Sequence, residues 1–90
     1  MKAAIIGAGS LGQSIAKGLL KNKVVNSLYL TKRNIDSIAD FNVYDEVILT
    51  SDNEEAIKKS EILIFAVQPR HLEAILKNVK HLLTENHVLI

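Results

Sequence analysis

Three glycines stand within six residues near the start of the chain, in the string Gly7-Ala8-Gly9-Ser10-Leu11-Gly12. In this G-x-G-x-x-G spacing the first glycine allows a tight turn out of a strand, and the second lets a pyrophosphate approach the backbone. The third lets the following helix pack closely, and that helix offers free N–H groups and its positive dipole end. The spacing predicts a dinucleotide-binding loop. A Walker-type phosphate loop is not supported, because no Gly-Lys-Ser/Thr follows the glycines. A methyltransferase remains an alternative.

The residues that would contact the adenosine ribose lie roughly 20 positions beyond the glycines. There the chain reads Thr31-Lys32-Arg33-Asn34, with no acid before Asp36. An acid would bind the ribose 2′-hydroxyl of NAD and repel a 2′-phosphate, whereas Lys32, Arg33 and the Thr31 hydroxyl can pair with that phosphate. A hydrogen bond to a charged group contributes about 1.5–3 kcal/mol, which corresponds to tenfold or more in affinity. We therefore expect NADP, with NAD possible; a merely solvated basic turn is the alternative.

A third candidate stretch, Phe65-Ala66-Val67-Gln68-Pro69, ends the most apolar segment of the chain. In a doubly wound sheet a strand at this place lies beside the first, at the crevice where ligands bind. Ala66 and Val67 would then line the nicotinamide side, and Pro69 would turn the chain into a helix. An ordinary strand-to-helix turn is the alternative interpretation.

Composition excludes several other kinds of chemistry. The chain has no cysteine, so disulfides, thiol nucleophiles and cysteine–metal sites are absent. Its formal charge of +1 gives no electrostatic reason to expect nucleic acid or membrane as partner. The three histidines, His71, His81 and His87, lack metal-ligand spacing, and His71, close to the crevice, is interpreted as a surface residue. We expect no metal site and a cytoplasmic protein.

The elements that would position these residues alternate regularly along the chain. Short apolar runs at 3–6, 27–31, 47–49, 61–67 and 88–90 predict strands, and helical periodicity predicts helices from residue 10, at 34–41, at 54–58 and at 70–83. Solid apolar strands between helices indicate a parallel sheet covered on both faces. The prediction is one α/β domain, residues 1–90, with a Rossmann-like doubly wound fold. Because the chain stops within the fifth strand, we expect a fragment of a longer protein.

With these stretches together, the sequence resembles the pyrroline-5-carboxylate reductases over essentially all its 90 residues. The resemblance is carried by the glycine loop with its helix (6–19), by 31–34, by 50–56 and by 60–69. It implies reduction of the imine of 1-pyrroline-5-carboxylate to L-proline by hydride transfer from NADPH or NADH, in proline biosynthesis. It also implies a following helical domain, absent here, that forms a homo-oligomer and contacts the imino-acid substrate. The catalytic residues are then expected beyond Ile90.

The resemblance also implies contacts for individual residues. The pyrophosphate would lie on residues 9–12, the adenosine end on 31–34, its ribose near Asn53, and the nicotinamide ribose near 66–68. The family usually has Met at Leu11 and Lys at Gln68, and the second difference removes a charge beside the cofactor. Another Rossmann dehydrogenase of the prephenate or β-hydroxyacid type, or another imine or keto reductase, therefore stays open, as does a non-catalytic dinucleotide sensor. The predicted cofactor-binding residues are Gly7, Gly9, Ser10, Leu11, Gly12, Thr31, Lys32, Arg33, Asn34, Asn53, Ala66, Val67, Gln68 and Pro69.

Overall fold

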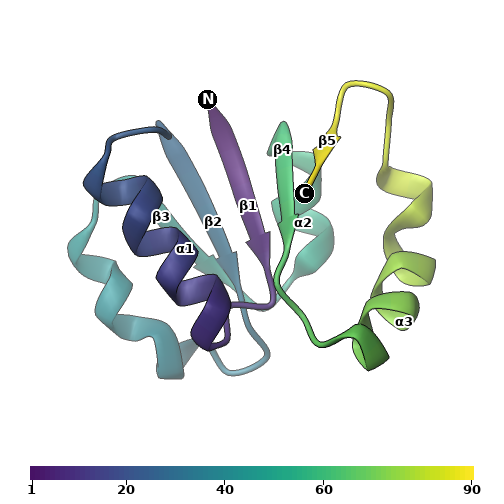
Figure 1. The fold of residues 1–90 in the computed structure, drawn as a ribbon, viewed down its shortest axis with the longest axis horizontal. Coiled ribbons are helices and arrows are strands. Elements are labelled where there is room, and N and C mark those ends of the chain that lie inside the picture. Colours follow the sequence, from purple (N-terminus) through teal and green to yellow (C-terminus); the bar gives the residue numbers. More distant parts are fainter.

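Five parallel strands form a single sheet in the order β3-β2-β1-β4-β5 (Figure 1). The computed structural model describes all residues from 1 to 90. The strands are β1 (Lys2–Ile6), β2 (Ser27–Thr31), β3 (Val47–Thr50), β4 (Ile62–Phe65) and β5 (Val88–Leu89). The helices are α1 (Ser10–Lys21), α2 (Asn53–Lys58) and α3 (Pro69–Val79), with 3-10 segments η1 (Ile35–Val43) and η2 (Lys80–Leu82). The predicted Rossmann-like doubly wound α/β fold is confirmed.

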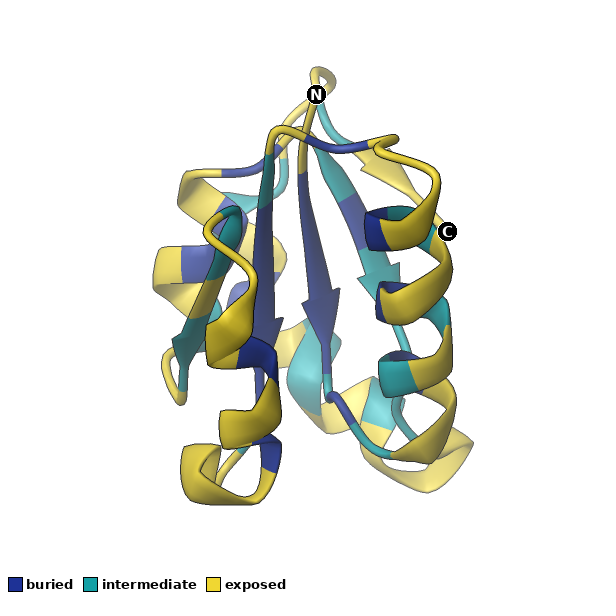
Figure 2. Cartoon of the chain, turned by 90° about the vertical axis from the view of Figure 1, so that its left-hand side faces the viewer, coloured by how far each residue is buried: buried dark blue, intermediate teal, exposed yellow.

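The two faces of the sheet carry separate apolar cores, because alternate residues of each strand point to opposite faces. Figure 1 shows α1 in front of the sheet and α2 behind it. On one face Ala3 and Ile5 of β1 pack in a cluster with α1 and η1, and on the other Ala4 and Ile6 pack with α2 and the end of α3. Figure 2 shows the consequence, with β1 and β2 buried and the outer faces of the helices exposed. Burial on both faces explains why the strands are solid apolar runs.

Two short helices begin where the sequence provides capping side chains. The Asn34 side chain accepts a hydrogen bond from the Asp36 N–H, and the Asp52 side chain accepts from Glu54 and Glu55. The first segment differs from the expectation: η1 is a 3-10 helix with a non-helical residue at Ile38, where an α-helix was expected. No helix of the chain is long and apolar enough to cross a membrane.

The strand order reverses between β1 and β4, and this places the carboxyl ends of three strands together. Ile6 is in register with Thr31 of β2 on one side and with Phe65 of β4 on the other. The strand expected at 61–67 is shorter in the structure and ends at Phe65. One further hydrogen bond follows it, from the Ala66 N–H to the Ile6 carbonyl. In open α/β sheets ligands bind at such a switch point, outside the carboxyl ends of the strands.

Candidate functional site

A cavity of about 700 Å³ lies at the carboxyl ends of β1, β2 and β4. Cationic side chains line it from two sides, Lys32 and Arg33 after β2 and Arg70 at the start of α3, and no Asp or Glu lines it. The absence of carboxylates among the lining residues suits a polyanionic ligand. The 14 lining residues are Gly7, Ala8, Gly9, Thr31, Lys32, Arg33, Ser51, Asn53, Ala66, Val67, Gln68, Arg70, His71 and Ile75.

The three glycines of the loop are needed for different reasons. Gly7 has φ +85°, and a Cβ on it would overlap Cγ1 of Val67. A Cβ on Gly12 would lie 3.0 Å from the Gly7 carbonyl oxygen and 3.1 Å from Cγ2 of Ile5. A Cβ on Gly9 would meet no atom of the chain within 4 Å. The fold itself thus explains Gly7 and Gly12, whereas only Gly9 leaves open space at the cavity, where a dinucleotide pyrophosphate fits.

The backbone donors of the loop divide into two groups. The Gly7 N–H donates to the side-chain oxygen of Thr31 at 3.0 Å, and the Ala8 N–H donates to the Thr31 carbonyl at 2.7 Å. The Gly9 N–H donates to the Gly7 carbonyl at 2.9 Å. The next three N–H groups, of residues 10–12, donate to no protein acceptor, and no side chain caps α1. Free donors and the positive helix end together form an anion site.

The end of β2 places only part of the predicted segment at the cavity. Thr31, Lys32 and Arg33 line it, as expected. The Thr31 side chain is 1% exposed, and its oxygen accepts the Gly7 N–H. Asn34 caps η1 and does not line the cavity. The two cations are therefore available to a ligand, whereas the polar groups of Thr31 and Asn34 serve the fold.

The opposite wall comes from the end of β4, where Ala66, Val67 and Gln68 line the cavity as expected. Pro69 is the first residue of α3 and lies outside this wall. Asn53 also lines the cavity, and because Asp52 caps α2, the Asn53 side chain has no capping role there.

Several predicted residues contribute backbone without lining the cavity, and some lining residues were not predicted. Ser10 and Leu11 stand at the start of α1, and Gly12 is buried beneath the loop. Ala8, Ser51, Arg70, His71 and Ile75 line the cavity without having been predicted to bind the cofactor. Ser51 could have been found because it follows β3 as Lys32 follows β2. His71 was placed close to the crevice from the sequence, whereas only the packing of α3 brings Ile75 to the site.

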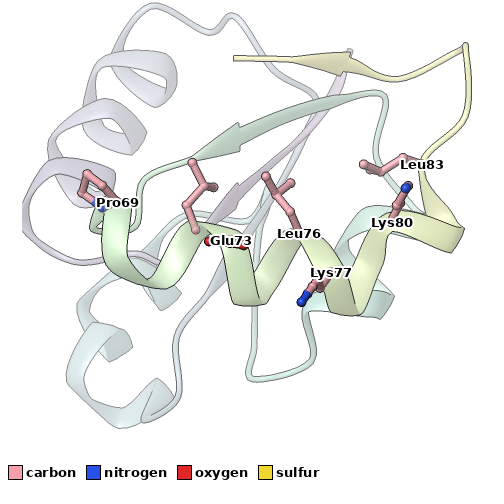
Figure 3. Close-up of a pocket in the computed structure, with 7 residues that line it drawn as sticks. Pro69, Glu73, Leu76, Lys77, Lys80 and Leu83 are labelled. Atoms are coloured by element: carbon pink, nitrogen blue, oxygen red, sulfur yellow. The ribbon is translucent and has the colours of Figure 1, made fainter.

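A second cavity, of about 520 Å³, lies along α3 and η2 (Figure 3). Half-buried leucines form much of its wall, and it shares no lining residue with the glycine-loop cavity. Its charged lining residues are Glu73, Lys77 and Lys80, and no group of three or more His, Cys, Asp or Glu that could hold a metal occurs in the structure. The residues around it are Pro69, Leu72, Glu73, Leu76, Lys77, Lys80 and Leu83.

The chain is similar in sequence and in fold to several known reductases. Pyrroline-5-carboxylate reductase 2 of Dictyostelium discoideum is 38% identical over 89 residues, which are 97% of this chain and 30% of the relative. The chain therefore spans about a third of the length of such relatives. A pyrroline-5-carboxylate reductase structure from Coxiella burnetii has a TM-score of 0.80 at 26% identity, covering 93% of this chain and 32% of that one. The structure of an imine reductase from Bacillus cereus BAG3X2 has a TM-score of 0.77 at 28% identity, and the match covers 97% of this chain and 29% of that one.

These relatives confirm the resemblance that the sequence suggested. A family model described as "NADP oxidoreductase coenzyme F420-dependent" matches residues 2–90, nearly the whole chain. The match includes the glycine loop, the basic segment after β2 and the end of β4. The chain thus belongs to this family of pyridine-nucleotide-dependent oxidoreductases.

Proposed function

We propose that this chain is the cofactor-binding domain of a reductase that converts 1-pyrroline-5-carboxylate to L-proline with NADPH. The observation that carries the proposal is the open space at Gly9 beside three free N–H donors, in a chain whose relatives bear that enzyme name. NADPH, when bound, supplies the hydride for the imine carbon, and a proton is added at the imine nitrogen. The chain's own residues bind and orient the dinucleotide.

In this proposal the cavity holds the dinucleotide along its length. The N–H groups of Ser10, Leu11 and Gly12 donate to the pyrophosphate. Lys32 and Arg33 lie at the adenosine end, and the wall formed by residues 66–68 lies at the nicotinamide end. Small, uncharged side chains at Ala66 and Val67 leave room for the nicotinamide ring, and Asn53 is available to a ribose hydroxyl.

We infer a preference for NADPH over NADH from the charges around the cavity. A 2′-phosphate adds negative charge where Lys32 and Arg33 face the cavity and no carboxylate opposes it. Arg33 is exposed, so solvent weakens its contribution. A preference of about tenfold corresponds to one hydrogen bond to a charged group, at the lower end of its range.

The proposal includes a second, helical domain in the longer protein, which contacts the imino acid and forms a homo-oligomer. It is supported by the length of the relatives and by the composition of the cavity, where His71 is the only histidine and no Asp or Glu lines the wall. The catalytic residues are placed in that domain, and residues 1–90 alone are expected to bind cofactor without turnover. The cytoplasmic location remains a prediction from the sequence.

The test is a comparison of two proteins, the 90-residue chain and its full-length form. We expect both to bind NADPH more tightly than NADH in a fluorescence titration, and only the longer protein to form proline from pyrroline-5-carboxylate. Reduction of NADP+ by prephenate or by a β-hydroxyacid instead would move the assignment to those dehydrogenases. Tight NADPH binding without turnover on any of these substrates would favour the dinucleotide sensor.

A further inference from the structure

Thr31 makes two hydrogen bonds to the glycine loop, although 24 positions separate it from Gly7. Its side-chain oxygen accepts the Gly7 N–H at 3.0 Å, and its carbonyl accepts the Ala8 N–H at 2.7 Å. The register that pairs Ile6 with Thr31 places the side chain at this point, and the residue is 1% exposed. Two successive loop donors are therefore held by one residue of the neighbouring strand.

This pair of bonds decides which backbone donors remain for a ligand. Gly7 directly follows β1 and has a positive φ of +85°, so the orientation of its peptide determines the path of the loop. With the N–H groups of Gly7 and Ala8 turned toward β2, the loop enters α1 with those of residues 10–12 free. Gln13 adds a further bond, from its side-chain amide to the Ala8 carbonyl at 3.0 Å.

Thr31 also joins the loop to the basic segment. The next two residues, Lys32 and Arg33, line the cavity, and the Lys32 N–H donates to the Thr50 carbonyl of β3 at 3.2 Å. The same residue thus connects the part of the cavity that faces a pyrophosphate with the part that faces the adenosine ribose. A change at its side chain disturbs the loop without removing either cation.

We propose that Thr31 is a positioning residue of the dinucleotide site, acting through its side-chain oxygen on the Gly7 turn rather than by contact with the ligand. The inference rests on the proposed dinucleotide binding and gives Thr31 a role other than the 2′-phosphate contact expected from the sequence. Because the loop serves the pyrophosphate, which NADPH and NADH share, loss of the Thr31 oxygen weakens both cofactors equally. A residue that contacts the 2′-phosphate would instead change their ratio.

The experiment measures dissociation constants of NADPH and NADH for the full-length protein with Thr31→Val, which keeps the shape, and Thr31→Ser, which keeps the oxygen. We expect Thr31→Val to weaken both by about tenfold with an unchanged ratio, the size of one hydrogen bond. Thr31→Ser should restore wild-type affinity. Thr84→Val is the matched control, since Thr84 accepts a similar local bond, from the Asn86 N–H, outside this cavity.

A selective loss of NADPH affinity in Thr31→Val would overturn the proposal and assign the side chain to the phosphate, and unchanged affinity for both would also overturn it. Amide hydrogen exchange in the ligand-free wild-type protein decides the matter if the valine variant does not fold. The Gly7 amide should exchange more slowly than those of Ser10 and Leu11, and equally fast exchange would refute the bond. The exchange measurement tests the Thr31–Gly7 bond and requires no cofactor. A failure of the wild-type protein to bind dinucleotides would contradict the proposed function, and the two failures are therefore distinguishable.

Discussion

Substitution of Gly9 by alanine should separate cofactor binding from folding. The Gly9 backbone has φ −79° and ψ −160°, which alanine adopts readily, and the added Cβ would meet no protein atom within 4 Å. Because alanine restricts the unfolded chain more than glycine, the free energy of unfolding should rise by about 0.4–1 kcal/mol. The same Cβ occupies the space where the pyrophosphate approaches the backbone. Loss of one hydrogen bond to a charged phosphate, about 1.5–3 kcal/mol, weakens NADPH binding about 10- to 150-fold.

The assay pairs thermal unfolding with a fluorescence titration of NADPH. Gly18→Ala is the control, because its Cβ would also meet nothing within 4 Å but lies on the exposed side of α1. It should stabilise the helix by about 0.5–1 kcal/mol and leave binding unchanged. Gly12→Ala is the opposite case, since its Cβ would lie 3.0 Å from the Gly7 carbonyl oxygen and should cost about 1–3 kcal/mol of stability. A folded Gly9→Ala protein with wild-type NADPH affinity would refute the reasoning.

Further predictions concern other parts of the site and fold. Arg33→Ala should reduce the NADPH-to-NADH affinity ratio by about tenfold, and an unchanged ratio in paired titrations would remove Arg33 from the site. Asp52→Ala removes the cap of α2 and should lower the free energy of unfolding by about 1 kcal/mol, seen as a melting temperature about 4–8 °C lower. Asn53→Ala should instead weaken NADPH binding and leave the melting temperature unchanged. Ser60→Ala should leave stability unchanged or raise it in urea unfolding, because the Ser60 hydroxyl is buried without a partner; a clear loss would reveal one.

Much of the fold follows from local patterns. The run from Ser27 to Thr31 was predicted with its observed bounds, and the helical segment expected at 34–41 is found as η1, capped by Asn34. The length of β4 was overestimated because its apolar run continues through Ala66 and Val67, which line the cavity beyond Phe65, the last residue of the strand, although the Ala66 N–H still donates to the Ile6 carbonyl. Apolar character alone does not distinguish a strand residue from a buried loop residue.

The site was predictable where residues directly follow a strand, as Lys32 and Arg33 follow β2 and Ala66 and Val67 follow β4. It was less predictable for residues that arrive on helices. Pro69 stands next to Gln68 in the sequence, yet it begins α3 outside the glycine-loop cavity, whereas Ile75, six residues later, lines it. The direction in which α3 crosses the sheet decides this, and it depends on packing between Val79 and the second core.

The sequence by itself determined the parallel strands, the turn at Gly7, the close packing at Gly12 and the family, because each depends on residue type at short spacing. Only the tertiary structure decided which donors of the loop remain free. That outcome depends on Thr31, which is brought to Gly7 by the register of β1 with β2 and not by any pattern within the loop. Hydrogen bonds between distant segments depend on how the strands pair in the folded sheet, so a local pattern predicts that a loop can bind an anion but not which N–H groups it presents.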